Sequence, residues 1–401
     1  MSRLLFWLAS GLIGWTYVGF PAVVLARGRL RPRPHRSGPI TPSVSIVIAA
    51  RNEEASIGAK LDNLAALDYP ADRLEVLIAS DGSDDATNRI VGARAEARLQ
   101  LLALPRVGKA AALNAAVAQA RGEILAFSDA NSMFAPDAIR RLVEPFADPE
   151  VGGVAGDQRY ASDGGEGGGE AAVAGGERSY WSLDRALKLA ESRGGHVISA
   201  TGAIYAVRRS LFREVPAAVT DDFATSTGVI AQGRRLVFAP DAVAYEAVGA
   251  TAEVEFSRKV RVMTRGLNGV RVRRELLNPR RHGFYALQLF SHKVLRRLMA
   301  VPLLVMAVTS TLLRRRSPFY ALASAGQLGL YAVGVLGLMA GRRPRARSKL
   351  VAAPTFFVMV NVASLQAVLN VVRGRDIAHW EPVSRAGAGA ADEETGGRAG
   401  H

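Results

Sequence analysis

The sequence predicts an α/β domain held between apolar helices that cross a membrane, and three observations support this fold class. Between residues 41 and 277, short apolar strands alternate with helical patterns. The strands lack polar alternation, which is typical of a parallel sheet covered by helices on both faces. Long apolar segments flank the domain on both sides, and most of them are long enough to cross a bilayer core of about 30 Å.

The composition favours a membrane over a nucleic acid as the partner of this basic chain. The 401 residues carry a formal net charge of +15, and 49% of them are hydrophobic. Nucleic acid is a common partner of such a chain. However, the basic residues cluster beside the apolar segments, at 27–36, 314–316 and 341–349, which is typical of contact with anionic lipid. We therefore expect membrane lipids as partners and no nucleic acid. The absence of cysteine excludes disulfides and thiolate chemistry.

The first apolar segment, residues 4–26, predicts an N-terminal transmembrane helix over 1–27. A cleaved signal peptide is the alternative, but its apolar core usually has only about 7–15 residues. The main basic block follows the segment, within a basic linker at 28–43. The positive-inside rule therefore places the N-terminus outside and the α/β domain, residues 44–277, in the cytoplasm.

Three further apolar segments predict about three transmembrane helices within the C-terminal part, residues 298–375. They occupy 298–313, 319–340 and 350–372. The first is short for a full crossing, so a re-entrant segment is the alternative. Residues 278–297 combine an apolar face with basic side chains and predict an amphipathic helix in the membrane interface, or else an ordinary packed helix. We expect a disordered tail over 376–401.

Within the α/β domain, the pattern predicts strands and helices in alternation. The expected strands are 44–50, 74–81, 101–104 and 123–129, and the expected helices are 53–67 and 109–120. The low-complexity stretch 163–176 is expected to be a mobile loop and carries no predicted chemistry.

Polar residues follow three of these strands, in the sequences AARNEE, SDGSDD and SDANS. The carboxyl ends of parallel strands meet at one edge of the sheet, and open α/β sheets bind ligands there. Asp81 and Asp129 thus lie where the fold would place a ligand. No GxGxxG follows the first strand, and the chain has no Walker A motif and no HExxH. The site is therefore not predicted to be a common dinucleotide, P-loop or zinc-protease site.

Seven motifs in order resemble those of the inverting family 2 glycosyltransferases, which have the Rossmann-like GT-A fold. They are SIVIAARNEE, SDGSDDAT, GKAAALN, FSDAN, TGAIYAVRR, TDDF and RKVRVMTRG. The chain is most similar to the membrane-embedded bacterial polysaccharide synthases, related to cellulose, hyaluronan and poly-N-acetylglucosamine synthases. The resemblance covers roughly residues 44–266 and the flanking apolar segments.

The resemblance implies a nucleotide-sugar donor and a divalent cation, Mg²⁺ or Mn²⁺, because such a hard ion bridges carboxylate and phosphate oxygens. The family's DxD motif appears as Asp129-Ala130-Asn131. Asp129 is expected to bind the metal and the donor, whereas Asn131 can offer only an uncharged carbonyl oxygen to the donor. A helix cap before Pro136 is the alternative role of Asp129.

The resemblance also implies donor contacts from residues near the other strand ends. Asp81 would contact the uracil or the ribose, and the loop with Arg51 and Glu54 would hold the base. Lys109 follows Gly108 at the start of a helix and would lie near the phosphates. A solvated lysine in the first helical turn is its alternative.

The TDDF motif is similar to the family's TED motif, with Asp222 in the place of the final acid. The resemblance implies that Asp222 removes the proton from the acceptor hydroxyl as that oxygen attacks the anomeric carbon. Asp221 would support it, and a helix cap is the alternative role of this acidic pair. Gly202 is expected in the wall of the acceptor site, where it would allow a close backbone turn.

The chain departs most from the family's QxxRW motif. Arg261 matches the motif's Arg, but Arg258 replaces the Gln and Val262 replaces the Trp. By resemblance, Arg261 stabilises the leaving diphosphate, and Arg258 and Arg265 lie near it. The missing Trp, which stacks on the acceptor sugar in processive synthases, puts processivity in doubt. A basic interfacial helix is the alternative for this segment.

The expected activity is hexosyl or N-acetylhexosaminyl transfer from a nucleotide-sugar, expected to be a UDP-sugar. The acceptor would be a growing polysaccharide or a lipid-linked glycan. We expect a multi-pass protein of the bacterial inner membrane with a cytoplasmic active site, whose C-terminal helices could form an export channel. The alternatives are a single transfer to polyprenyl phosphate or another lipid, and a non-catalytic membrane scaffold descended from such an enzyme.

Overall fold

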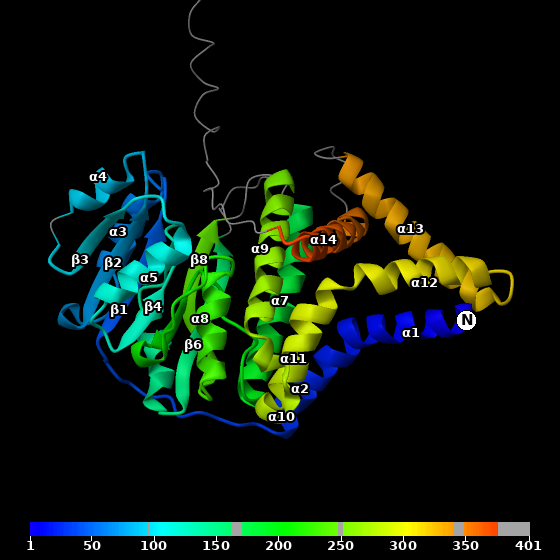
Figure 1. Cartoon of the computed structure of the whole chain (residues 1–401), viewed down its shortest axis with the longest axis horizontal. Coiled ribbons are helices and arrows are strands. Elements are labelled where there is room, and N and C mark those ends of the chain that lie inside the picture. The colour runs from blue at the N-terminus through cyan, green and yellow to red at the C-terminus, as the bar shows by residue number, and fades with distance from the viewer. Residues whose placement is uncertain (95, 162–170, 248–251, 341–348, 376–401) are drawn as a thin grey trace, which may run out of the picture.

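The structure, a computed structural model, describes residues 1–94, 96–161, 171–247, 252–340 and 349–375. One eight-stranded sheet with flanking helices forms the α/β domain, and the apolar helices extend from one side of it (Figure 1). The expected fold class is therefore confirmed. The division of the chain at residues 27, 43, 277 and 297 stays a prediction. The tail 376–401, expected to be disordered, lies outside the described residues.

The strands follow the order β3-β2-β1-β4-β7-β6-β8-β5 across the sheet. Their bounds are β1 (Val44–Ala50), β2 (Leu74–Asp81), β3 (Leu99–Leu104), β4 (Ile124–Phe127), β5 (Ser132–Phe134), β6 (Val151–Ala161), β7 (Tyr205–Arg208) and β8 (Arg235–Ala247). The first four strands are parallel, as expected. However, β7 is antiparallel to both β4 and β6, and β5 is antiparallel to β8, so the sheet is mixed. A strand buried on both faces is apolar in either direction, so composition alone could not reveal this reversal.

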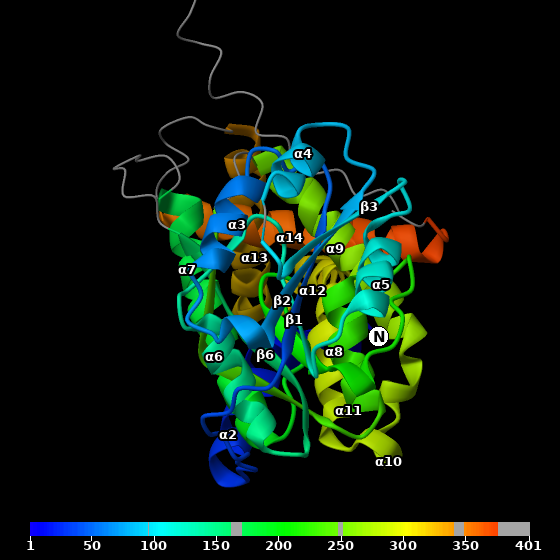
Figure 2. The ribbon, with the colours of Figure 1, turned by 90° about the vertical axis from the view of Figure 1, so that its left-hand side faces the viewer.

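Helices cover both faces of the sheet, which explains the apolar strands. All seven residues of β1 are buried. Ile46 and Ile48 pack in the cluster that includes α3 (Ile57–Ala65) and α6 (Ala138–Val143), whereas Val47 packs in the cluster that includes α5 (Lys109–Gln119) and α8 (Asp221–Ala231). Figure 2 shows α3 and α6 on one side of the strands and α5 and α8 on the other.

Two long helices, α7 (Ala171–Gly194) and α9 (Ala252–Val272), lie between the sheet and the apolar helices (Figure 1). The expected mobile loop at 163–176 is wrong for its second half, because 171–176 already belong to α7. The alanines at 171, 172 and 174 favour this helical start. Residues 163–170 lie outside the described residues. The remaining short elements of the domain are η2 (Ala71–Arg73), α4 (Thr87–Gly92), η3 (Glu144–Ala147), η4 (Arg209–Leu211), η5 (Arg274–Leu277) and α10 (Pro279–His282).

Three helices of the described chain are long and apolar enough to cross a membrane: Ser2–Leu30, Pro318–Ala340 and Leu350–Val372. The first comprises α1 (Ser2–Gly14), η1 (Trp15–Gly19) and α2 (Phe20–Leu30), and the others are α13 (Pro318–Ala340) and α14 (Lys349–Val372). A fourth candidate joins Phe284–Arg297 to Ala300–Leu313 with a bend of 59°, as in a broken span or a re-entrant loop. It contains α11 (Phe284–Leu289), η6 (Phe290–Val294), η7 (Leu295–Arg297) and α12 (Ala300–Leu313). The short apolar segment at 298–313 and the segment expected as an interfacial helix, 278–297, therefore contribute to one bent pair of helices.

Candidate active site

The carboxyl ends of β1, β2 and β4 lie side by side, as the sequence predicts. In the parallel register, Ala50 lies opposite Ser80 and Val47 lies opposite Phe127. The loops that follow these strands therefore start at the same edge of the sheet. This edge brings together the expected donor residues of three separate motifs.

Lys109 joins the DxD-like motif to the TDDF motif. Its Nζ lies 2.7 Å from Asp129 Oδ1 and 3.3 Å from Asp221 Oδ1. Burial opposes the charge of Lys109, but the charges of Asp129 and Asp221 outweigh burial and hold its pKa above the ordinary value. Burial likewise favours neutral Asp129, yet the Lys109 charge keeps the pKa of Asp129 below its usual range. The lysine thus lies between two carboxylates rather than in bulk solvent.

Gly202 provides the space that the Asp129 carboxylate occupies. A Cβ at position 202 would lie 2.9 Å from Asp129 Oδ2. The sequence analysis expected this glycine to allow a close backbone turn. The structure adds a second reason for glycine, because the neighbouring side chain belongs to a distant segment of the chain. The place of Gly202 in the wall of the acceptor site stays a prediction.

Lys60 supports the same motif from inside the domain, and the sequence analysis missed it. The side chain is fully buried, and its Nζ donates to Ser128 Oγ at 2.9 Å and to the Ser132 carbonyl. Burial lowers the pKa of Lys60 to about 7, against the opposing charge of Asp129. The signal was its position on the apolar face of α3, three residues after Ile57 and four before Leu64.

Asp81 shapes the loop that leads to Lys109. It is 1% exposed, and its Oδ1 accepts hydrogen bonds from the backbone N–H groups of Val107 at 2.7 Å and Gly108 at 2.8 Å. Gly108 has a φ of 91°, a conformation that favours glycine, and α5 begins at the next residue. The contact of Asp81 with the donor base stays a prediction.

Hydrogen bonds connect the loop after β1 to the loop after β2. The Glu54 N–H donates to Asp85 Oδ2, and Glu54 Oε2 accepts from the Ala86 N–H, both at 3.0 Å. Arg51 is partly buried, and its Nε has no hydrogen-bond partner within the described part of the chain. The two loops thus form one wall of the edge, and donor binding by Arg51 and Glu54 stays a prediction.

Asp221 and Asp222 occupy the first turn of α8, after Thr220 at the N-cap. Burial, followed by the charge of Asp221, raises the pKa of Asp222. A carboxylate with a raised pKa is a better proton acceptor, and its place in the first turn is also favourable for the helix. The two roles considered for Asp222 are therefore compatible. The nearby Arg265 donates to the carbonyls of Ala217 at 3.2 Å and Val219 at 2.7 Å, which holds the segment before the motif.

The arginines of α9 influence one another electrostatically. Burial lowers the pKa of Arg261, and the charges of Arg265 and Arg258 lower it further. Val262, at the position of the family's Trp, is 45% exposed. Glu246 near the end of β8 was not predicted as a site residue. Burial and the charge of Asp129 raise its pKa to about 7, against the opposing charge of Arg258.

The described side chains suit a metal ion whose coordination is completed by the phosphate oxygens of a bound ligand. Among the described residues, no group of three His, Cys, Asp or Glu could hold a metal alone. Asp129 offers a carboxylate, and the exposed Asn131 follows in the turn between β4 and β5. Mg²⁺ commonly takes one or two carboxylates and fills its remaining positions with phosphate oxygens and water. The donor set is thus compatible with such an ion.

Comparison with known proteins assigns the α/β domain. Residues 45–215 match the family model of Glycosyl transferase family 2. A beta-monoglucosyldiacylglycerol synthase of Synechocystis sp. is 33% identical over 161 residues, which cover 37% of this chain and 33% of that protein. An N-acetylglucosaminyltransferase of Rhizobium meliloti is 30% identical over 238 residues, covering 55% of this chain and 54% of that protein. The matches thus span between a third and about half of these relatives.

One solved structure matches almost the whole fold. The mannosyltransferase PcManGT from Pyrobaculum calidifontis, in complex with GDP-Man and Mn²⁺, aligns with a TM-score of 0.70 and 23% identity. The alignment covers 92% of this chain and 99% of that one. The family match over residues 45–215 confirms the family that the motifs indicated, and this likeness confirms the fold. The chain therefore carries a family 2 glycosyltransferase domain with the GT-A fold.

Proposed function

We propose that this protein transfers a sugar from a nucleotide-sugar to an acceptor at a membrane, with inversion at the anomeric carbon. The observation that carries the proposal is the position of Lys109 between Asp129 and Asp221. This contact joins the motif expected to bind the donor to the motif expected to activate the acceptor. Donor and acceptor would therefore meet at one edge of the sheet.

In this mechanism, Asp222 is the general base. Its raised pKa makes the carboxylate a stronger proton acceptor than an exposed aspartate, and it stays ionised above that pKa. Asp222 takes the proton of the acceptor hydroxyl while that oxygen attacks the anomeric carbon. The bond to the diphosphate breaks on the opposite side, so one displacement inverts the configuration and leaves no sugar on the protein.

Positive side chains would stabilise the leaving diphosphate. Arg261 and Arg258 come from α9, and Lys109 comes from the start of α5. Asp129, with Asn131 beside it, would hold Mg²⁺ or Mn²⁺ together with the donor's phosphates. The ion would supply further positive charge for the departing nucleotide. The protein's own contribution is to orient these groups and to keep Asp222 close to them.

We further propose that the three apolar helices and the bent pair anchor the domain in the bacterial inner membrane, with the active site in the cytoplasm. Apolar length and the basic blocks at 27–36 and 341–349 support this setting. A lipid or a lipid-linked glycan is then an accessible acceptor.

A single transfer to a lipid is the second candidate, and two observations favour it over polymer synthesis. Position 262 carries an exposed valine where processive relatives have the stacking Trp. The Synechocystis relative is named for a glycolipid product. A non-catalytic scaffold is disfavoured because Asp129, Lys109 and Asp221 form one contacting set.

The test is nucleotide release by the purified full-length protein in nanodiscs, with a panel of UDP- and GDP-sugars and Mg²⁺ or Mn²⁺. Diacylglycerol, polyprenyl phosphate and membrane extract serve as acceptors in separate arms. We expect release with one donor, its loss in Asp129→Ala, and normal release in Asp72→Ala, which changes an exposed aspartate. A polymeric product would exclude the single-transfer candidate. No release in any arm, from folded protein, would contradict the proposed function.

A further inference from the structure

A cavity of about 180 Å³ lies away from the catalytic edge, between α2, α7 and the segment α10–α11. Figure 1 shows α2 and α10 at the end of the domain opposite to α4, which follows the carboxyl end of β2. The volume corresponds to roughly six water molecules at about 30 Å³ each. The cavity is thus large enough for a small polar group.

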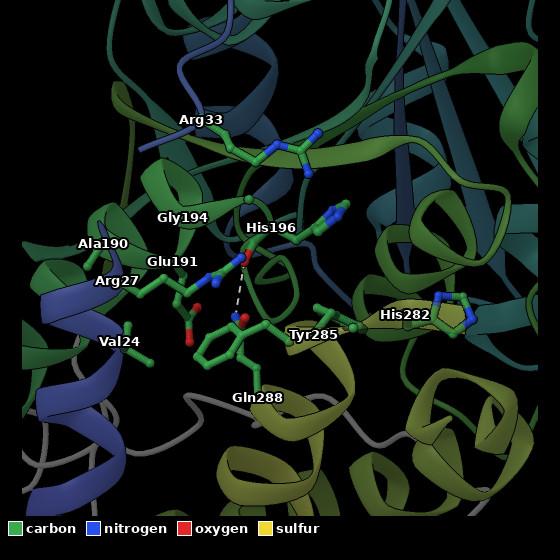
Figure 3. A pocket seen from close by; sticks show the side chains of 13 residues that line it. Val24, Arg27, Arg33, Ala190, Glu191, Gly194, His196, His282, Tyr285 and Gln288 are labelled. Carbon is green, nitrogen blue, oxygen red and sulfur yellow. Dashed lines mark hydrogen bonds between the residues drawn. The ribbon is translucent and has the colours of Figure 1, made fainter. Parts of the chain in front are cut away.

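Basic residues outnumber acidic ones in the lining of this cavity. Arg27, Arg33, His196 and His282 line it, and Glu191 is the one acidic residue among its lining residues. Figure 3 shows Arg27 and Gln288 extending toward His196, with Arg33 above them in this view. The wall therefore combines two permanently charged guanidinium groups with two imidazoles.

The acidic residue is engaged through one of its two carboxylate oxygens. Glu191 Oε2 accepts a hydrogen bond from the Ile198 N–H at 3.0 Å, and Oε1 lies 3.7 Å from His292 Nδ1. Arg27 Nε, His196 Nδ1 and Glu191 Oε1 are each buried without a hydrogen-bond partner in the described chain. Burial lowers the pKa of His196 to about 4, and the charges of Arg235 and Arg33 act in the same direction. The two guanidinium groups thus outnumber the single carboxylate in the lining, and Arg27 Nε is a donor without a partner among the described residues.

The cavity lies at the depth expected for lipid headgroups, a step that depends on the membrane setting proposed above. The helix Ser2–Leu30 has 29 residues, so at about 1.5 Å per residue it is roughly 44 Å long. A hydrocarbon core of about 30 Å takes up roughly 20 of these residues. If Ser2 lies at the outer boundary, Val24 lies near the inner boundary and Arg27 lies one turn beyond it.

We propose that this cavity binds a phosphate group, and that the phosphate belongs to the headgroup of an anionic phospholipid. Arg27 and Arg33 would supply charge-assisted hydrogen bonds, which are stronger than neutral ones. The stack of Arg27 on Phe284, 4.5 Å from its ring centroid, keeps the guanidinium in place. The bound lipid would fix the end of α2 against α7 and α11.

The experiment measures binding of short-chain phosphatidylglycerol to the full-length protein in neutral detergent by calorimetry. Phosphatidylcholine of the same chain length and inorganic phosphate are the comparison ligands. The test variant is Arg27→Gln/Arg33→Gln. The matched control is Arg29→Gln/Arg31→Gln, which removes the same charge from exposed residues outside the cavity lining. Because binding is read without a sugar donor, the result is independent of transferase activity.

We expect phosphatidylglycerol to bind wild type and control alike, and at least about tenfold more weakly to the test variant. Arg33→Gln alone, at an exposed side chain, gives a partial loss even if the double variant fails to fold. Equal weakening in control and test variant would overturn the cavity site, because general attraction to a basic segment then explains the binding. Binding of inorganic phosphate as tight as that of the lipid would overturn the lipid assignment.

Discussion

The two sides of the candidate active site differ in how their charges are balanced. On the side expected to bind the donor, Asp81 accepts hydrogen bonds from two backbone N–H groups and Asp129 pairs with Lys109. On the α9 side, Arg261 lies close enough to Arg258 and Arg265 for their charges to lower its pKa further. The carboxylates expected to bind the donor thus lie beside hydrogen-bond donors or an opposite charge, whereas the Arg261 guanidinium lies near like charges.

This difference indicates which parts are already arranged and which depend on a ligand. The donor side is held in place by its own hydrogen bonds, so a bound nucleotide needs little rearrangement there. A diphosphate beside Arg261 would offset the like charges of Arg258 and Arg265. Catalytic losses should therefore be large where charge develops during transfer, and smaller where only the shape of the donor side changes.

The largest effect is expected from Asp222→Asn, because this change removes the proposed base but keeps the side-chain volume. We expect kcat to fall by about 10²–10⁴-fold while the donor KM changes little. Nucleotide release under saturating donor measures it. An Asn variant with nearly wild-type kcat would exclude Asp222 as the base.

The next effect concerns Arg261, the arginine proposed to contact the leaving group. Arg261→Gln should lower kcat/KM for the donor by about 10²–10³-fold, since it removes a charge that stabilises the departing diphosphate. Arg271→Gln is the matched control, because Arg271 is an exposed residue near the end of the same helix. If both variants lose activity equally, the loss reflects the charge of α9 as a whole and not a specific contact.

A smaller effect is expected on the donor side from Gly202→Ala. The added Cβ would lie 2.9 Å from Asp129 Oδ2, so the carboxylate must shift away from its contact with Lys109. We expect the donor KM to rise by roughly tenfold, equivalent to about 1.4 kcal/mol. Gly266→Ala serves as the control, because a Cβ there meets nothing within 4 Å. An unchanged KM in Gly202→Ala would show that the position of Asp129 is not critical.

The smallest effect is a shift in pH dependence. The base must be ionised, so activity falls as pH decreases through the pKa of Asp222. The charge of Asp221 contributes to the raised pKa of Asp222. Asp221→Asn should therefore move the acid limb of kcat/KM to lower pH, as measured from pH–rate profiles of both proteins. A limb that moves to higher pH would contradict the assignment.

The candidate residues of this site could be predicted from the sequence, but the contacts between them could not. Asp129 and Asp222 follow recognisable signals, namely a polar residue after an apolar strand and an acidic pair before a helix. The contacts of Gly202 with Asp129 and of Lys60 with Ser128 join distant segments, and no local pattern encodes them. The direction of β7 was equally hidden, because both faces of the strand are covered. Local chemistry was thus predictable, whereas long-range partners required the structure.

The central claim is a direct displacement with Asp222 as the base, and the anomeric configuration of the first-formed product tests it most directly. NMR of the product, recorded early in the reaction with a donor of known configuration, gives the answer. We expect the configuration opposite to that of the donor. Retention would contradict the account, since it requires two displacements or another mechanism.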